Sequence, residues 1–337
     1  MCLYPKLIKN PKYKANKKNG GQVPPIFDNR IVMVPIGCGK CVECCKQKAN
    51  NWRVRLHEEI KKDNTGTFVT LTFNTEQLRK LYETIRIKHK LKDYELDNAV
   101  ARLAVRRFLE RWRKENKKSV KHWLVTELGG KHYEHLHIHG IIWTKDKDKI
   151  EKHWQYGYVY GSKEKTFVNE KTINYIVKYI FKIDEKHKAY KAIILTSSGI
   201  GSNYINRSDV NNNIYKGEET NERYKTRQGY EVALPIYYRN KIYTEKEREL
   251  LWIDKLNKQK RYVLGSEIDI SNGDENYWLA LKYAQRINKE LGYGGDANTW
   301  EQENYERELR RLKQMERMHE KKNKKNTRGS NAPREND

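Results

Sequence analysis

The stretch EHLHIHGIIW, residues 134–143, places a histidine at every second position of an otherwise apolar run. Alternate side chains of a β-strand point to opposite faces, so His135, His137 and His139 are expected to share one face. The aliphatic residues among them fall on the other face: Leu136, Ile138 and Ile142. The sequence therefore predicts a strand with one side in the core and the other presenting a candidate ligand set.

The residues before this strand predict its partner. Residues 121–143 have the pattern of two strands joined by a hairpin loop that contains Gly-Gly. Glu127 lies on the first strand, and hairpin pairing brings it near His137 or His139. Two imidazoles and one carboxylate with open positions suit Mg²⁺ or Mn²⁺, and the imidazoles would also bind Zn²⁺. His135 is a candidate outer ligand or phosphate contact. The alternative is a set of surface histidines on an edge strand.

The neighbouring segments extend the hairpin into an α+β domain. The predicted elements are a strand over 66–74, a helix over 93–116, the hairpin, a short helix over 145–154, a strand over 156–162 and a helix over 170–182. This order is that of a ferredoxin-like or RRM-like antiparallel sheet with helices on one side. We place this core at residues 63–185.

The rest of the chain divides by composition. The segments are a cysteine-rich N-terminal segment (1–62) that ends in a basic helix (48–62), an accessory α/β extension (186–265), a charged helical region (266–323) and a disordered basic tail (324–337). Within the extension, residues 206–230 are expected to be a polar loop. Thr244 and Glu247 predict a capping box at the start of a helix.

The helix predicted over 170–182 has two different faces. Its apolar stripe has helical spacing: Ile173, Ile176, Val177 and Ile180. The other face, about 200° away, repeats the pattern Tyr-x-x-Lys with the residues Tyr175, Lys178, Tyr179 and Lys182. A helix that only covers a sheet has no need of tyrosines on its exposed face, so we predict that they are nucleophiles. The alternative is a pair of amphipathic tyrosines on a partly buried helix.

The five cysteines are Cys2, Cys38, Cys41, Cys44 and Cys45. The spacing C-x2-C-x2-C lets three thiolates converge on one metal ion, which then needs a fourth ligand. Cys2 is the first candidate, with Cys45 or His57 as substitutes. We predict a structural zinc site; an iron–sulfur cluster and unligated thiols are the alternatives.

The charge of the chain predicts its partner. Lys and Arg number 69 against 44 Asp and Glu, which gives a net charge of +25, and 23 Tyr and 8 Trp accompany these cations. Such a composition is typical of proteins that bind nucleic acid, with a membrane surface or simple solubility as the alternative. On the helix over 93–116, the predicted DNA-binding residues are Arg102, Arg106, Arg107 and Arg113. No apolar run approaches the roughly 20 residues of a membrane span, and we expect a soluble intracellular protein.

Several motifs together resemble a known family. They are, in order, CGKCVECCKQKANNWRVRL, FVTLTF, TELGG, HIHG, YIVKYIFK and SSGIGSNYI. Over residues 1–245 the chain resembles the replication initiators of microviruses, the small icosahedral single-stranded-DNA phages, and most of all their gokushovirus-type branch. These are HUH endonucleases. The resemblance implies an enzyme that nicks single-stranded DNA at the phage origin, keeps the 5′ end as a phosphotyrosine and leaves a 3′-OH for the host polymerase.

The resemblance also assigns roles to residues. The HUH pair falls on His137 and His139, and the two family tyrosines fall on Tyr175 and Tyr179. Where many relatives have Arg-Pro, this chain has His135 and Leu136, which leaves the shifted pair His135/His137 open. The family implies origin DNA, host helicase and host polymerase as partners, and the host bacterial cytoplasm as location.

The resemblance predicts a mechanism as well. The bound ion would polarise the scissile phosphate, two tyrosines about 6 Å apart would take turns as nucleophile, and two lysines, Lys178 and Lys182, would offset phosphate charge. Two rivals are a non-enzymatic zinc-containing DNA-binding or packaging protein, and a transposase or relaxase with the same chemistry. The cysteine motif and the paired tyrosines argue against the second rival.

Overall fold

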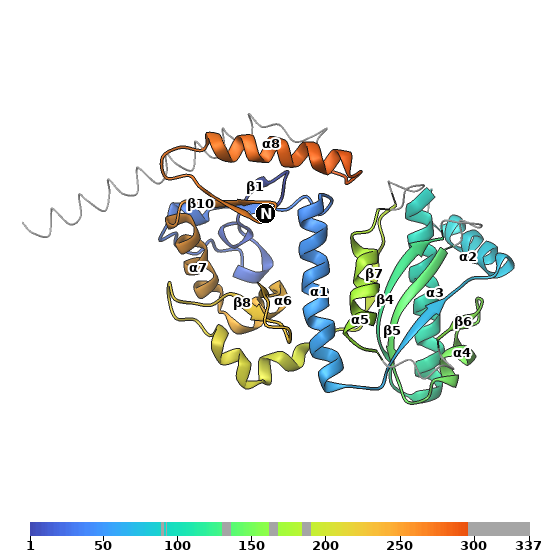
Figure 1. Cartoon of the computed structure of the whole chain (residues 1–337). Coiled ribbons are helices and arrows are strands. Elements are labelled where there is room, and N and C mark those ends of the chain that lie inside the picture. Colours follow the sequence, from blue (N-terminus) through green and yellow to red (C-terminus); the bar gives the residue numbers. More distant parts are fainter. Residues whose placement is uncertain (89–90, 92, 130–135, 162–167, 184–189, 296–337) are drawn as a thin grey trace, which may run out of the picture. The chain divides into compact units, whose positions relative to one another are not determined.

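The computed structural model describes residues 1–295 except for 89–90, 92, 130–135, 162–167 and 184–189 (Figure 1). His135 and the tail predicted over 324–337 lie outside the described residues. The chain forms two compact units. One unit contains Met1–Cys44, Lys216–Glu219 and the described residues from Thr244 on, and the other contains Cys45–Tyr215 and Thr220–Tyr243.

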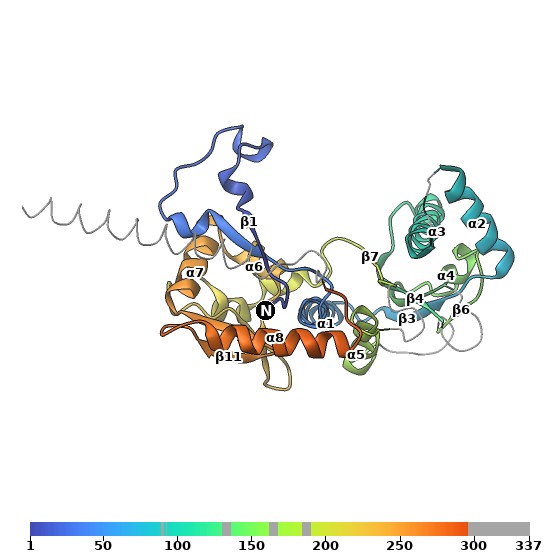
Figure 2. The ribbon, with the colours of Figure 1, turned by 90° about the horizontal axis from the view of Figure 1, so that it is seen from above.

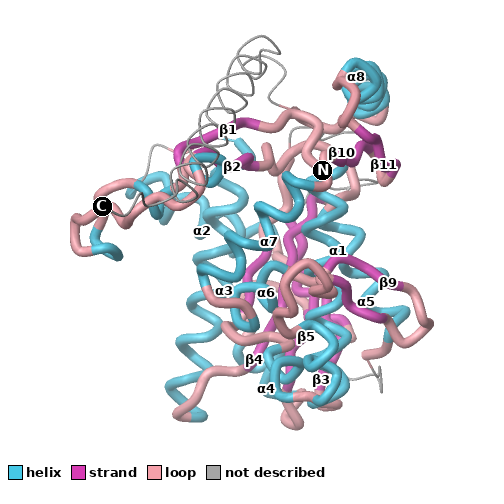
Figure 3. The backbone as a smooth tube through the Cα atoms, turned by 90° about the vertical axis from the view of Figure 1, so that its left-hand side faces the viewer, coloured by secondary structure: helices cyan, strands magenta, loops and turns pink. Residues whose placement is uncertain are grey.

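The second unit is built on one antiparallel sheet. Its five strands are β3 (Gly66–Leu71), β4 (Lys121–Leu128), β5 (Leu136–Trp143), β6 (Val159–Tyr160) and β7 (Ile194–Thr196). They lie side by side in the order β6-β3-β5-β4-β7, and the long strands β4 and β5 are drawn in magenta in Figure 3. The predicted α+β class and the antiparallel sheet are confirmed. The first four of these strands follow the predicted split βαβ order, and β7 extends the sheet beside β4.

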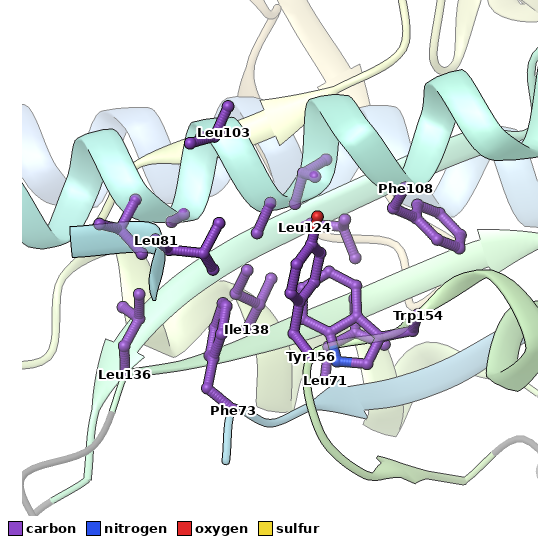
Figure 4. Close-up of a cluster of buried hydrophobic side chains, with 14 of the residues drawn as sticks. Leu71, Phe73, Leu81, Leu103, Phe108, Leu124, Leu136, Ile138, Trp154 and Tyr156 are labelled. Atoms are coloured by element: carbon purple, nitrogen blue, oxygen red, sulfur yellow. The ribbon is translucent and has the colours of Figure 1, made fainter. Parts of the chain in front are cut away.

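One face of the sheet carries the larger core. Three helices cover it: α2 (Thr75–Lys88), α3 (Asp93–Asn116) and α4 (Asp148–His153). Their apolar side chains pack on strand residues such as Leu71, Leu124 and Ile138, which are fully buried (Figure 4). Viewed from above, α2 and α3 lie together on this side of the sheet (Figure 2). Helix α2 was not predicted.

The opposite face of the sheet is covered as well, over part of its area. Two helices lie on it, α1 (Val42–Lys62) and α5 (Glu170–Val177), and a short 3₁₀ turn (Lys178–Ile180) continues α5. The strand residues beneath them are apolar: Trp123, Val125, Ile141 and Trp143. Helices therefore lie on both sides, because this apolar half of the second face also needs to be removed from water.

The segment after β7 is anchored to α1. The backbone N–H of Gly201 donates to Glu59 at 2.6 Å, and Arg55 donates to the carbonyl of Ile200 at 3.0 Å. A Cβ on Gly201 would lie 2.4 Å from the Arg55 carbonyl oxygen, so only glycine allows this approach. Beyond it, the region predicted as a polar loop contains two 3₁₀ segments (Ser202–Asn206, Ser208–Asn213) and β8 (Arg223–Lys225), followed by β9 (Glu231–Ala233) and α6 (Ile236–Ile242).

The first unit has a small core of its own. Its elements are β1 (Lys6–Lys9), three 3₁₀ turns (Pro11–Tyr13, Lys17–Asn19, Asn29–Ile31), β2 (Met33–Ile36), α7 (Glu245–Asn257), β10 (Lys260–Val263), β11 (Ser266–Asp269) and α8 (Glu275–Glu290). Leu3, Tyr277 and Leu281 are among its buried residues. The predicted capping box at the start of α7 is confirmed, because Thr244 and Glu247 bond each other's backbone N–H.

The position of Gly140 in the middle of β5 yields a stability prediction. A Cβ there would lie 2.1 Å from the carbonyl oxygen of Trp123 and 2.8 Å from the Cα of Leu124, and backbone atoms cannot rotate away. We expect Gly140→Ala to lower the free energy of unfolding by about 1–3 kcal/mol, measured by urea denaturation. Gly294→Ala is the matched control, because its nearest atom is at an ordinary 3.5 Å. Equal stability of the two variants would contradict this packing.

Candidate active site and metal centre

The strand register brings the predicted ligand residues to one face. Glu127 on β4 lies directly opposite His137 on β5, and Thr70 on β3 lies opposite His139. Directly paired residues of antiparallel strands point to the same side of the sheet. These four side chains therefore share the face that α5 partly covers, at its polar end.

His139 is the centre of this cluster. Its Nε2 lies 2.8 Å from a carboxylate oxygen of Glu127, and its Nδ1 lies 2.9 Å from the hydroxyl of Thr70. The ring of His137 is nearly parallel to it, with centroids 6.4 Å apart. Lys182 donates to the second oxygen of Glu127 at 3.3 Å. These contacts favour His137/His139 as the functional pair.

The two tyrosines meet this cluster from α5. The helix begins at a capping box in which Asn169 accepts from the N–H of Thr172 at 3.0 Å. The ring of Tyr179 stacks on that of His139, with centroids 4.8 Å apart and an interplanar angle of 5°. Its hydroxyl donates to the hydroxyl of Tyr175 at 2.6 Å. Histidine and tyrosines are thus in continuous contact.

The tyrosines differ in accessibility, although both were expected on the exposed face. Tyr175 is 43% exposed, whereas Tyr179 is 8% exposed. The reason is local: the α-helix ends at Val177, and the tighter 3₁₀ turn that follows rotates Tyr179 toward the sheet. The distance between the hydroxyl oxygens is accordingly much shorter than the spacing of one helical turn.

The cluster affects the protonation of its members. Burial alone would raise the pKa of Glu127, but the hydrogen bond with His139 and the charge of Lys182 outweigh burial and hold that pKa below its usual value. Burial, the hydrogen bond to Tyr175 and the charge of Glu127 raise the pKa of Tyr179 well above the usual range. The carboxylate is therefore ionised, and Tyr179 is a neutral hydrogen-bond donor.

The donor types in this cluster fit a hard divalent ion. His139 and Glu127 point their Nε2 and Oε2 atoms at each other, and the charged carboxylate balances a cation. The three groups are less compact than a closed metal site: within the described parts of the chain, only the four-cysteine group brings three or more such ligand atoms within 4.8 Å of one another. An open set of this kind leaves room for substrate oxygens.

Two contributors were not predicted from the sequence. Thr70 fixes the ring of His139 through its hydroxyl, and Phe68 contacts the ring of Tyr175 edge-on, with centroids 6.0 Å apart. Both lie on the strand whose motif, FVTLTF, was assigned no chemistry. The alternation of that motif, once placed on the correct face, was the available signal.

The arginines predicted to bind DNA lie elsewhere. Arg102, Arg106 and Arg113 are exposed, and Arg107 is half-buried, on α3. This helix packs on the face of the sheet opposite to His139. DNA binding by these arginines stays a prediction, and they are not part of the cluster around the tyrosines.

The four predicted zinc ligands come together in the first unit. The Sγ atoms of Cys2, Cys38, Cys41 and Cys44 all lie within 4.8 Å of one another. Two of the separations are 3.9 Å, between Cys41 and Cys2, and 4.0 Å, between Cys38 and Cys44. Tetrahedral zinc with bonds of about 2.3 Å requires sulfur separations of about 3.8 Å. This group can therefore hold a metal ion such as zinc.

Backbone groups prepare the thiols for a cation. The Sγ of Cys38 accepts from the N–H groups of Lys40 and Cys41, at 3.4 and 3.3 Å, and the Sγ of Cys2 accepts from those of Tyr4 and Cys38, at 3.3 and 3.2 Å. Such bonds stabilise thiolates. Cys2 is thus the fourth member of the group in the described structure, to which Cys45 and His57 do not belong.

Comparison with known proteins supports a role in replication. The model of one family, the replication-associated proteins of the ORF2 type, matches residues 66–184, which is about a third of the chain. The match covers the sheet and both tyrosines, and it indicates interaction with nucleic acid. Neither the curated proteins nor the solved structures contain a match. Among the described residues, no helix is long and apolar enough to cross a membrane.

The cysteine group gives a testable expectation. Elemental analysis of the purified chain should find about one zinc per molecule. Cys41→Ser should lose that metal and lower the melting temperature of the first unit, because a closed thiolate site stabilises its fold. Cys45→Ser is the matched control and should keep both. A metal-free native protein of unchanged stability would contradict a structural zinc.

Proposed function

We propose that this chain is a rolling-circle replication initiator of the microvirus type, an HUH endonuclease that nicks and rejoins single-stranded origin DNA through a 5′-phosphotyrosine intermediate. The single observation that carries the proposal is the continuous contact Glu127–His139–Tyr179–Tyr175 on one face of the sheet. A structural histidine would need neither an ionised carboxylate nor a pair of tyrosines beside it. The family match to the same residues supports the proposal.

The covalent step needs a nucleophile and a charged environment. The hydroxyl oxygen of Tyr175 bonds to the scissile phosphorus as the bond to the 3′ oxygen breaks. The phenolic proton leaves to solvent, and the 3′ oxygen takes up a proton to become the 3′-OH. Lys178 lies over the ring of Tyr175, with Nζ 4.1 Å from the centroid, where its charge favours the phenolate and attracts the phosphate. A tyrosine ester retains the bond energy for rejoining.

The remaining residues hold this nucleophile in place. Thr70 orients the ring of His139, and the ring of Tyr179 rests on that histidine. An Mg²⁺ or Mn²⁺ ion on His137, His139 and Glu127 would supply Lewis-acid polarisation of the phosphate oxygens. The hydroxyl of Tyr179 donates to that of Tyr175 and thereby stabilises negative charge on its oxygen. We therefore assign the first cut to Tyr175 and the second transfer to Tyr179.

The metal-ligand assignment is tested by nicking. His137→Ala and His139→Ala should each abolish cleavage of labelled single-stranded origin DNA with Mn²⁺, while DNA affinity changes little, because the basic surface supplies most of the affinity. Cleavage is read as a covalent protein–DNA band on a denaturing gel. Melting curves of both variants control for folding. Undiminished cleavage by the double variant would end the HUH assignment.

The tyrosines are separated by single substitutions. Tyr175→Phe should slow the first cut by at least about 100-fold, because it removes the accessible nucleophile. Tyr179→Phe should still form the adduct but should not release rejoined circles, because no second hydroxyl remains. Tyr230→Phe, at an exposed tyrosine on another segment, is the control. If both tyrosines proved dispensable, the chain would be a non-enzymatic DNA-binding protein.

A further inference from the structure

Strand β6 presents two tyrosines to solvent that the proposed chemistry does not use. Tyr158 is 73% exposed and Tyr160 is 60% exposed, whereas Val159 between them packs against the larger core. Removing an aromatic ring from water is favourable, so exposed neighbouring rings on a strand are costly to keep without a function. Their centroids are 6.3 Å apart, and the rings are tilted rather than stacked on each other.

The register places these rings on the face of the proposed active site. Tyr160 lies opposite Thr70, and Thr70 lies opposite His139 on the next strand. Tyr158 continues the pairing, because its carbonyl accepts from the N–H of Thr72 at 2.9 Å. Two strand spacings separate Tyr160 from His139, which is about 10 Å. The exposed rings and the candidate metal ligands therefore lie side by side on one surface.

Two glycines fix β6 firmly against β3. A Cβ on Gly157 would lie 2.5 Å from the carbonyl oxygen of Thr72, and a Cβ on Gly161 would lie 2.4 Å from that of Phe68. Gly161 also has φ +88°, a conformation that side chains disfavour. The strand that carries the tyrosines is thus held at both ends by close backbone approach, which gives the rings a rigid support.

We propose that Tyr158 and Tyr160 form a stacking platform for unpaired nucleobases of single-stranded DNA beside the cleavage site. The inference rests on the proposed function for the identity of the substrate. Every base has an aromatic face, and rings exposed on an antiparallel sheet of this class can stack successive bases. The charge of +25 supplies attraction for the phosphates that accompany those bases.

A protein partner is the other occupant that an exposed edge strand can have. Strand addition requires a run of free backbone groups, and β6 contains only two residues, Val159 and Tyr160. Bases need only the rings. The combination of a short edge, exposed aromatic faces and an overall excess of cations therefore favours DNA.

The platform is tested by binding rather than cleavage. Fluorescence anisotropy would compare the full-length protein with the double variant Tyr158→Ala/Tyr160→Ala, without added divalent metal. The probes are a labelled oligothymidine and an abasic strand of equal length. We expect the double variant to bind oligothymidine about 5- to 50-fold more weakly, with an unchanged salt dependence because phosphate contacts persist. Binding to the abasic strand should be the same for both proteins.

Three controls make the result specific. The double Phe variant should bind like the wild type, because stacking needs the rings and not the hydroxyls. Tyr230→Ala, at a position 70% exposed on another segment, should also bind normally. Melting curves exclude a folding defect. Equal affinity of wild type and double Ala variant for oligothymidine, or an equal loss on the abasic strand, would overturn the platform, and so would unchanged DNA binding with altered self-association.

The same variants distinguish this inference from the nuclease proposal. Base-dependent loss of affinity in the Ala variant, together with a wild-type protein that forms no covalent adduct, would support the platform and refute the nuclease. Normal adduct formation with unchanged affinity in the Ala variant would refute only the platform.

Discussion

The antiparallel register between β4 and β5 is the constraint on which the candidate site depends. It places Glu127 opposite His137 and one diagonal step from His139, whose ring then bonds the carboxylate. A slip of one residue would turn the histidines into the larger core and expose Leu136 and Ile138. The apolar residues of β5 thus specify the register, and the register assembles the site. The absence of a side chain at Gly140 is part of the same constraint, because β4 backbone occupies that space.

The second face of the sheet combines support and chemistry. Its apolar half is covered by α1 and α5, and this packing holds the end of α5 over His139. The change from α-helix to 3₁₀ turn at Lys178 then gives two tyrosines four residues apart unlike environments. The buried tyrosine is a neutral donor and the exposed one an acceptor. In the proposed reaction this asymmetry orders the two steps, which chemically equivalent tyrosines would not.

Much of this arrangement could be predicted from local patterns. Alternation identified β5 and its paired strand, the two-residue cysteine spacing identified the metal group, and Thr244 with Glu247 identified the start of α7. Helix α2 was missed although Leu78, Leu81 and Ile85 have helical spacing. The burial of Tyr179 and the role of Thr70 could not be predicted in this way, because both depend on which elements meet across the sheet rather than on the residues beside them.

The most direct test of the account identifies the atom that becomes attached to DNA. The protein is incubated with Mn²⁺ and a single-stranded origin oligonucleotide, the adduct is digested with protease and nuclease, and the modified peptide is sequenced by mass spectrometry. The account predicts a 5′-phosphonucleotide on Tyr175 in the first turnover, with the 3′ product ending in a hydroxyl. A modification only at a residue outside Tyr175 and Tyr179, or free 5′-phosphate ends without any covalent adduct, would contradict it.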